Sequence, residues 1–186
     1  MRWSPILLLG LFLLSPAGAK TVEGVDLPET VTVGGEQLVL NGAGVREKFF
    51  FDIYVAALYL PEPSRDAGQI LNRDQPWRML MHFVYRKVDH EKLADGWEEG
   101  FGGNLDPGQL KGLRERLDYF KSLFPTLRKG DEVVLDYLPG QGVQVRIGGQ
   151  KRGVVAGADF ARALLSVWLG RQPVTRELRQ ALLGGQ

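Results

Sequence analysis

The residue best suited to chemistry in this sequence is Arg46, which follows the glycine-rich segment Asn41-Gly42-Ala43-Gly44. A guanidinium is always charged, and it can hold a carboxylate or an enolate through two parallel hydrogen bonds. Tyr54 follows at an even spacing, so in an unbroken strand its hydroxyl would share the side of the sheet that Arg46 faces. We therefore expect Arg46 to face any ligand, with Tyr54 as the nearest phenol.

Other kinds of chemical site find little support in the sequence. The two histidines, His82 and His90, lack a partner at metal-ligand spacing, and there is no cysteine for a thiolate site. No G-x-S-x-G segment marks a nucleophilic serine, and Glu98-Glu99 diverge because they are adjacent on a predicted helix. The glycine segment also lacks the Gly-Lys-Ser/Thr of a phosphate loop. We predict neither a metal nor a cofactor.

Two apolar stretches predict the strands that position Arg46. Lys48–Leu60 is rich in aromatic and β-branched residues, so we expect one long strand that forms the floor of the site, with Asn41–Gly44 as a turn at its entrance. Trp77–Lys87 alternates between two faces with a period of two, which is typical of a sheet covered on one side. Both stretches therefore belong to one half-buried sheet.

The remaining segments alternate between helical and strand patterns. Aspartates can cap helices over Glu91–Phe101 and Gly108–Phe124, and a short helix is expected over Ser64–Leu71 with Ser64 as its cap. The order predicts an α+β fold, in which a mostly antiparallel sheet carries helices on one face. The later elements are predicted as a meander of strands over Glu132–Leu138, Val143–Ile147 and Lys151–Ala156, followed by helices over Ala158–Leu169 and Arg176–Leu183.

Residues 1–19 look like a secretory signal peptide. Arg2 precedes the apolar run Ile6–Leu14, and Ala17-Gly18-Ala19 offers a cleavage site before Lys20. The alternative, a membrane anchor, is less favoured because the run is far shorter than the roughly 20 residues that span a bilayer. We expect a periplasmic domain of residues 20–186 with no membrane span after cleavage. Since only Arg2 is lost from 23 basic and 22 acidic residues, the domain would have no net charge, which argues against a nucleic-acid partner.

Three segments together resemble the chalcone isomerase superfamily, in its bacterial chalcone isomerase-like branch. They are Asn41–Leu60, where GAGVR precedes an aromatic strand ending in LYL; Trp97–Phe124, a Gly-rich junction before an amphipathic helix; and Ala158–Leu183, with its W-L-G junction between two closing helices. The resemblance implies an open-faced β-sandwich, in which a large antiparallel sheet is covered on one face by a layer of helices, with a ligand cleft between them.

The resemblance also implies roles for individual residues. Arg46 matches the arginine that, in the plant enzymes, stabilises charge on the chalcone during ring closure. The hydroxyl-bearing positions of those enzymes fall on Tyr54, on the Phe101-Gly102 region and near Val167, so only the arginine and one phenol are polar here. The ligand-binding residues implied are therefore Arg46, Tyr54, Phe101 and Val167.

Three functions remain open at this point. The first is a non-catalytic protein that binds a small amphipathic or aromatic acid, such as a fatty acid, at Arg46. The second is an intramolecular lyase or isomerase that acts on a chalcone-like enone through Arg46 and Tyr54. The third is an interaction module of the cell envelope that has no ligand. The missing hydroxyls favour the first over the second.

Overall fold

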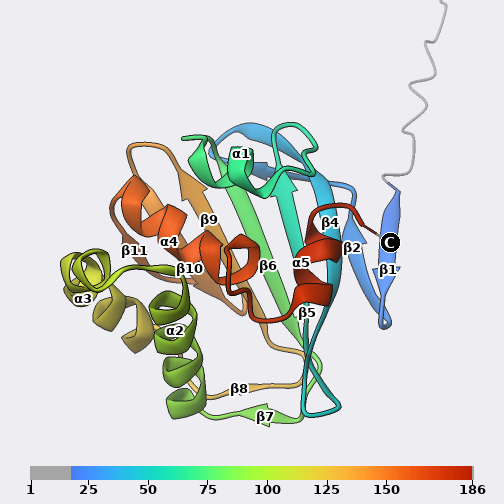
Figure 1. Cartoon of the computed structure of the whole chain (residues 1–186). Helices are drawn as coiled ribbons and strands as arrows, with labels where there is room; N and C mark the ends of the chain where they lie inside the picture. The colour runs from blue at the N-terminus through green and yellow to red at the C-terminus, as the bar shows by residue number, and fades with distance from the viewer. Residues whose placement is uncertain (1–17, 186) are drawn as a thin grey trace, which may run out of the picture.

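A single antiparallel sheet dominates the computed structural model, which describes residues 18–185 (Figure 1). Its seven strands lie in the spatial order β11-β10-β9-β6-β5-β4-β3, and all neighbours are antiparallel. The strands are β3 (Thr30–Val33), β4 (Glu36–Lys48), β5 (Phe51–Leu60), β6 (Trp77–Phe83), β9 (Glu132–Leu138), β10 (Gly142–Ile147) and β11 (Gln150–Val155). At one edge of the sheet, the pairing of β10 with β11 shifts register between Val145 and Arg146.

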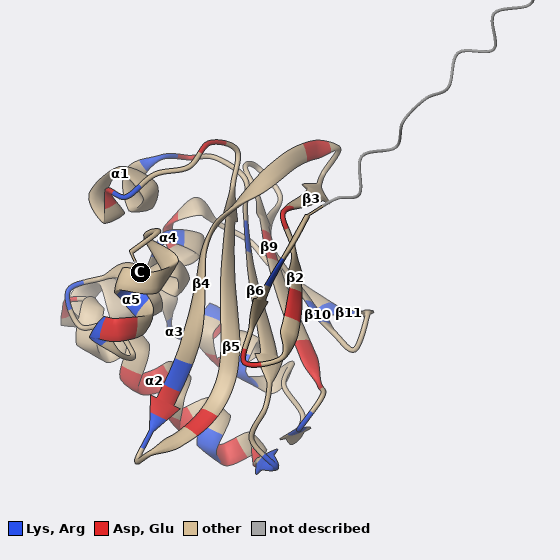
Figure 2. Cartoon of the chain, turned by 90° about the vertical axis from the view of Figure 1, so that its right-hand side faces the viewer, with Lys and Arg blue, Asp and Glu red and all other residues tan. Residues whose placement is uncertain are grey.

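All five helices of the described chain lie on one face of the sheet, as Figure 2 shows from the side. They are α1 (Ala67–Asn72), α2 (His90–Asn104), α3 (Pro107–Ser122), α4 (Ala158–Leu169) and α5 (Arg176–Leu182). Two small ribbons complete the fold: β1 (Ala19–Val22) pairs with β2 (Val25–Pro28), and β7 (Lys87–Val88) pairs with β8 (Leu127–Arg128). The predicted α+β fold, with one large antiparallel sheet and helices on one face, is confirmed.

The main core lies between the sheet and the helices. At its centre is α4, in which nine of the twelve residues are buried, because a helix that is mostly apolar is stable only when most of its surface is enclosed. Trp168 of α4 meets Trp97 of α2 edge to face, with ring centres 5.7 Å apart. A smaller core lies on the opposite face, where Leu27 of β2 and Tyr59 of β5 are both buried. The β1–β2 ribbon therefore covers part of the face that the helices leave open.

The opposite face also contains a buried carboxylate. Asp136 of β9 is held by Arg78 of β6, with 2.6 Å between the carboxylate and Nε, and by Arg146 of β10. Two cations around one carboxylate compensate its loss of hydration, which is the condition for burying such a group. This cluster joins three neighbouring strands at the centre of the sheet.

The strands under Arg46 differ from the sequence prediction. Instead of one strand after a glycine turn, β4 and β5 form a long hairpin whose turn is Phe49-Phe50. The predicted turn at Asn41–Gly44 is wrong, because these residues lie inside β4, where the pairing with β5 shifts register between Leu40 and Gly42. Arg46 therefore lies near the end of β4 and not at the entrance of β5.

The glycines of β4 are explained by close packing. A Cβ built on Gly42 would lie 2.1 Å from the backbone oxygen of Ala181, and one on Gly44 would lie 2.6 Å from the Cβ of Ala181. Both distances are far below van der Waals contact, so α5 rests directly on the backbone of β4. Asn41 strengthens this contact because its amide nitrogen donates to the backbone oxygen of Leu182 at 2.7 Å.

Two helix boundaries also differ from prediction. α1 begins at Ala67 and is capped by Asp66, whose side chain accepts from the backbone N–H of Gln69, so Ser64 is not its cap. α2 continues past Phe101 to Asn104, because the Asn104 side chain ties the last turn to the chain after α4. The predicted aspartate cap of α3 is confirmed at Asp106, whereas Asp89 lies at the N-cap position of α2 and makes no side-chain capping hydrogen bond.

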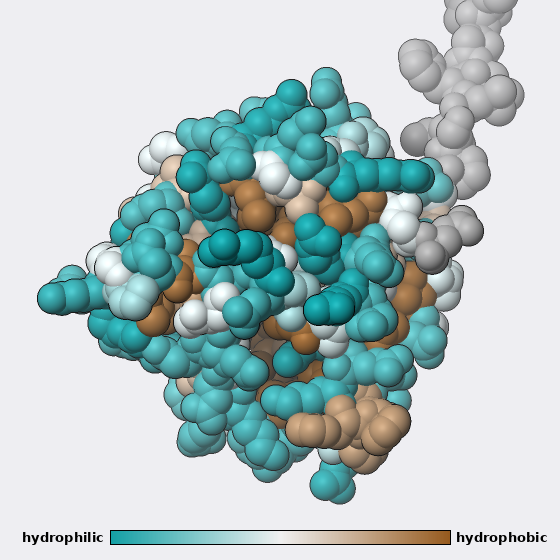
Figure 3. All heavy atoms as spheres, in the orientation of Figure 1, coloured by the Kyte–Doolittle hydropathy of each residue, from teal (hydrophilic) through white to brown (hydrophobic). Residues whose placement is uncertain are grey.

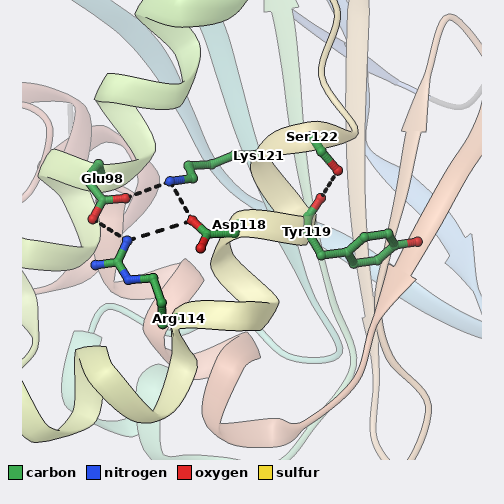
Figure 4. Close-up of polar contacts among 6 residues, drawn as sticks. All are labelled: Glu98, Arg114, Asp118, Tyr119, Lys121 and Ser122. Atoms are coloured by element: carbon green, nitrogen blue, oxygen red, sulfur yellow. Dashed lines mark hydrogen bonds and ion pairs between the residues drawn. The ribbon is translucent and has the colours of Figure 1, made fainter.

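A group of charged side chains fixes α2 against α3 (Figure 4). Glu98 of α2 accepts from Arg114 at 2.6 Å and from Lys121 at 2.9 Å, and Lys121 also contacts Asp118 at 2.8 Å. Partial burial alone would raise the pKa of Glu98, but these two hydrogen bonds outweigh it and hold the pKa below its usual value. The group keeps α2 in place beside the site that is described next.

Part of the predicted leader falls outside the structure. Residues 1–17 lie outside the described range, whereas Ala19 and Lys20 belong to β1 and pair with Pro28 and Leu27. Within residues 18–185, no helix combines the length and the apolar character needed to cross a bilayer.

Candidate functional site

Arg46 and Tyr54 lie directly opposite each other on neighbouring strands. They are register partners in the β4–β5 hairpin, and both face the helices. The guanidinium carbon of Arg46 lies 5.8 Å from the centre of the Tyr54 ring, at the outer limit of a cation–π contact. The sequence therefore predicted the shared side of the sheet, although the two residues meet across two strands and not along one.

Both residues line a small cavity between the sheet and α2. Its volume is about 50 Å³, and two of its lining residues, Arg46 and Lys92, are basic, whereas none is acidic. Its other walls are mainly apolar, and include Met81, Phe83 and Leu93. The full lining is Arg46, Ile53, Tyr54, Met81, Phe83, Val88, Lys92, Leu93, Gly96, Trp97, Val167 and Val174. Such a cavity favours an anion with an apolar part.

Hydrogen-bond donors at this cavity lack acceptors. The Nε of Arg46 and the Nε1 of Trp97 are buried, and neither has a hydrogen-bond partner among residues 18–185. Such groups are rare in folded proteins, because a buried donor without an acceptor costs about 1–3 kcal/mol. A third buried polar group without a hydrogen-bond partner, which we also call orphaned, is the Tyr59 hydroxyl on the opposite face of the sheet. Two of the three orphaned groups found in this range therefore belong to residues of one cavity.

The Tyr54 hydroxyl supplies a further donor. It accepts a hydrogen bond from the Nε1 of Trp168 at 3.0 Å, and no described residue accepts its own proton. Complete burial raises the pKa of Tyr54, and the Arg46 charge and the Trp168 hydrogen bond offset this rise only in part. Tyr54 therefore keeps its proton at neutral pH and can donate it to a ligand.

A wider groove continues from the cavity toward solvent. It has a volume of about 220 Å³ and shares Arg46, Gly96 and Val174 with the inner cavity. Its outer wall is polar and contains Lys48 and Glu99. Figure 3 shows a hollow with a hydrophobic floor in this region, between α2 and the β4–β5 hairpin. Arg46 thus stands where an apolar interior meets a polar entrance.

The four residues predicted for the site are distributed unevenly. Arg46, Tyr54 and Val167 line the inner cavity. Phe101 lies one helical turn beyond Trp97, is fully buried and packs against Phe160, with ring centres 5.4 Å apart. Phe101 is not among the residues that line the cavity. The assignment of ligand-binding roles to these residues stays a prediction.

Sequence reasoning missed three residues of this region. The helical period places Trp97 on an apolar face, and only the polar N–H of its indole signals another role. Lys92 lies in the first turn of α2, where it resembles any exposed lysine. Trp168 falls in the strongly apolar α4, and nothing in the sequence signals its bond to Tyr54.

The cavity offers donors but no general base. Its lining contains neither a carboxylate nor an imidazole. His82 pairs with Val55 and Glu132 within the sheet, and His90 contacts the backbone oxygen of Phe124 at 2.6 Å. The site is therefore equipped to hold an oxyanion and has, among its described lining residues, no side chain that would remove a proton at neutral pH.

A larger groove of about 440 Å³ lies among the helices. It is bordered by α1, α3 and α4, and its charged residues are Asp159, Arg162 and Arg171. These three are exposed, and the groove contains none of the orphaned buried donors. The chemistry of the chain therefore points to the smaller cavity at Arg46. The described residues contain no cluster of three or more His, Cys, Asp or Glu side chains that could hold a metal ion.

Comparison with known proteins places this geometry in a family. The sequence profile of the chalcone isomerase-like family matches residues 19–184. The chain belongs to the chalcone isomerase-like family. Among the curated proteins, none matches its sequence. Among solved structures, the fold is similar to that of a fatty-acid binding protein of Arabidopsis thaliana, with a TM-score of 0.67 at 20% identity, covering 89% of this chain and 96% of that chain. This similarity supports the chalcone isomerase-like fold, and the residues of the cavity must indicate the function.

Proposed function

We propose that this chalcone isomerase-like protein binds a small amphipathic carboxylate, such as a fatty acid, and does so without catalysis. The observation that supports this most is the set of donors at one apolar cavity, which are the N–H groups of Arg46 and Trp97 and the hydroxyl of Tyr54. A carboxylate is an acceptor with about four lone-pair sites, so it can satisfy several donors at once. The structural neighbour from Arabidopsis thaliana is a fatty-acid binding protein, which agrees with this ligand class.

The cavity volume limits the part of the ligand that is enclosed. At about 10–15 Å³ for each water-sized centre, 50 Å³ holds a group of roughly four heavy atoms. We infer that the carboxylate lies at Arg46 and that a few methylenes fill the inner cavity or the wider groove. A longer chain must widen the space between α2 and the β4–β5 hairpin.

The affinity should therefore depend on both ends of the ligand. Each enclosed methylene contributes about 0.8 kcal/mol, and the charge-assisted contact to Arg46 contributes about 1.5–3 kcal/mol. A titration of straight-chain carboxylates from butanoate to dodecanoate, followed by tryptophan fluorescence and calorimetry, measures the first term. The affinity should rise with length and level off where the enclosed space ends.

Octanol, octanoate and two variants separate the head-group term. Octanoate should bind the native protein about 10–100-fold more tightly than it binds Arg46→Met, whereas octanol should bind both equally. Arg171→Met is the matched control, because Arg171 is an exposed arginine of the larger helical groove. Equal affinity for octanol and octanoate in the native protein would overturn the proposed site. Turnover of a chalcone that disappears in Arg46→Met would show the lyase instead.

We further propose that the protein acts in the periplasm after removal of residues 1–19. The sequence of this leader supports the proposal, with its single basic residue, its apolar run and its small residues before Lys20. Cell fractionation with N-terminal sequencing tests it. A mature product that begins near Lys20 in the periplasmic fraction is expected, and an uncleaved product in the cytoplasm would refute it.

A further inference from the structure

The turn of the β4–β5 hairpin has an unusual composition. Phe49 and Phe50 have φ values of 51° and 67°, in the left-handed region that bulky residues rarely adopt. Three other hairpins of this chain use two-residue turns with positive φ, and each has glycine at the second position: Glu23-Gly24, Gly34-Gly35 and Gly148-Gly149. Among these four described turns, only the β4–β5 turn places two aromatic residues where the backbone calls for Asn-Gly.

The aromatic rings at this turn do not contribute to the core. The exposed fractions are 79% for Phe49, 101% for Phe50 and 55% for Phe51. Phe51 touches Tyr85 edge to face, with ring centres 5.5 Å apart, whereas Phe50 is as exposed as in an extended chain. Three consecutive exposed phenylalanines are uncommon on a soluble domain, and such a patch usually marks an interaction site. We call Phe49, Phe50 and Phe51 the aromatic tip.

The aromatic tip projects from one end of the molecule, next to the entrance of the Arg46 groove. Figure 1 shows the hairpin extending beyond the body of the sheet, and Figure 3 shows the apolar surface of its end beside the hollow. Lys48 belongs to both features, because it lines the groove and its Nζ lies 5.8 Å from the centre of the Phe49 ring. Whatever the tip contacts will therefore lie close to the groove.

The surface around the tip carries a small excess of positive charge. Figure 1 places the β7–β8 ribbon at the same end of the molecule. Residues 47–52, 86–89 and 127–131, which contain the tip and the ribbon, carry five basic residues and four acidic ones, and Asp89 is paired with Lys87 at 2.8 Å. The residues are Lys48, Arg86, Lys87, Arg128 and Lys129 against Glu47, Asp52, Asp89 and Asp131. With one net positive charge, this end of the molecule can bind an anionic surface, but it does not need negative charge on that surface in order to bind.

We propose that the aromatic tip inserts into the interfacial region of a lipid bilayer. The hairpin that carries the tip extends beyond the body of the sheet, and Phe50 is as exposed as in an extended chain, so the tip suits a deformable acyl layer better than a flat protein surface. The flanking lysines and arginines can stay at the level of the head groups while the phenyl rings lie deeper. This inference goes beyond ligand binding and does not require it, although it would bring the Arg46 groove to the membrane surface.

The number of rings sets the expected strength. Each phenyl ring that leaves water should strengthen binding to the bilayer by roughly tenfold or more. Replacing Phe49 and Phe50 should therefore weaken the binding by about 100-fold. An anionic lipid should strengthen it by less than about tenfold, because only one net positive charge lies at this end.

The double variant Phe49→Asn/Phe50→Gly tests the proposal. Asn-Gly is the preferred sequence for this turn, so the variant should fold with a higher denaturation midpoint than the native chain. Co-sedimentation with phosphatidylcholine vesicles, with and without phosphatidylglycerol, measures binding. We expect the native protein to sediment and the variant to stay in solution. Tyr119→Ser is the control, because Tyr119 is a 47% exposed aromatic residue on α3, away from the tip.

Two further measurements keep the outcomes distinct. Absence of native protein from both vesicle pellets, or equal sedimentation of the variant, would overturn the proposal. So would concentration-dependent self-association through the tip without vesicle binding, measured by analytical ultracentrifugation. Octanoate titration of the double variant should match the native protein, so loss of vesicle binding with intact octanoate binding concerns the tip alone.

Discussion

Replacing Arg46 by methionine should make the ligand-free protein more stable. In the native chain the Nε of Arg46 is buried without a partner among the described residues, and removing such a donor should recover about 1–3 kcal/mol. The lost contact between the guanidinium and the Tyr54 ring offsets about 0.5–1 kcal/mol of this gain, because the distance of 5.8 Å is at the limit of a cation–π interaction. The free energy of unfolding should therefore rise by about 1 kcal/mol, with an upper limit of about 2.5 kcal/mol.

Urea denaturation of delipidated protein measures this change directly. In a chain of this size, about 1 kcal/mol corresponds to a rise in Tm of about 2–4 °C. Arg171→Met should change the free energy of unfolding by less than about 0.5 kcal/mol, because Arg171 is exposed and its side chain has no ion pair within residues 18–185.

Saturating ligand should reverse the order of stability. Octanoate at about 100 times its Kd for the native protein adds about 2.7 kcal/mol to that protein, and about 0.4–1.4 kcal/mol to Arg46→Met, which binds it about 10–100-fold more weakly. The native chain would then be the more stable of the two. Destabilisation of ligand-free Arg46→Met by more than about 1 kcal/mol would refute the proposed role, because it would show that Arg46 is part of the structural core.

Two further predictions concern residues that stabilise the fold. Gly42→Ala should lower the free energy of unfolding by about 1–3 kcal/mol, because the new Cβ would lie 2.1 Å from the backbone oxygen of Ala181. Gly112→Ala should raise it by up to about 1 kcal/mol, because Gly112 lies in open space on α3. Urea denaturation of both variants measures the two changes. Burial and the hydrogen bond to Asp74 raise the pKa of Tyr137 from 10.0 to about 12. Since the folded state holds this proton more tightly, the contribution is complete below pH 10 and is lost as the pH rises through 12; denaturation across this range should show a smaller loss in Tyr137→Phe, and an unchanged loss would contradict the assignment.

The parts of the fold with strong periodicity could be predicted from the sequence. The alternation around Trp77–Phe83 fits only a strand that is covered on one side, and the apolar run of α4 fits only an enclosed helix. The sequence therefore predicted both elements correctly. The β4–β5 hairpin did not follow, because its glycines serve contact with α5 and its turn contains two phenylalanines. Turn preferences of single residues gave the wrong prediction for both segments. The glycines of β4 are required by packing against α5, and the Phe49-Phe50 turn does not follow the usual residue preferences of such turns.

The candidate site was predictable only in part for a related reason. Arg46 stood out because it is an arginine between a glycine-rich segment and an apolar stretch, and Tyr54 because of its even spacing. The N–H of Trp97 is unpaired because no acceptor lies near the indole in the folded chain, and the order of residues in the sequence does not show this. The same holds for the bond between Trp168 and Tyr54, which joins residues 114 positions apart.

The two edges of the sheet also have a consequence for how copies of the chain meet. One edge, β3, has only four residues. The other, β11, starts with the exposed residues Gln150, Lys151 and Arg152, and its register shift interrupts the regular row of peptide groups. Charges, short length and bulges all prevent a strand from another molecule from continuing a sheet. Neither edge therefore offers a long, regular row of peptide groups on which a strand from another copy of the chain could pair.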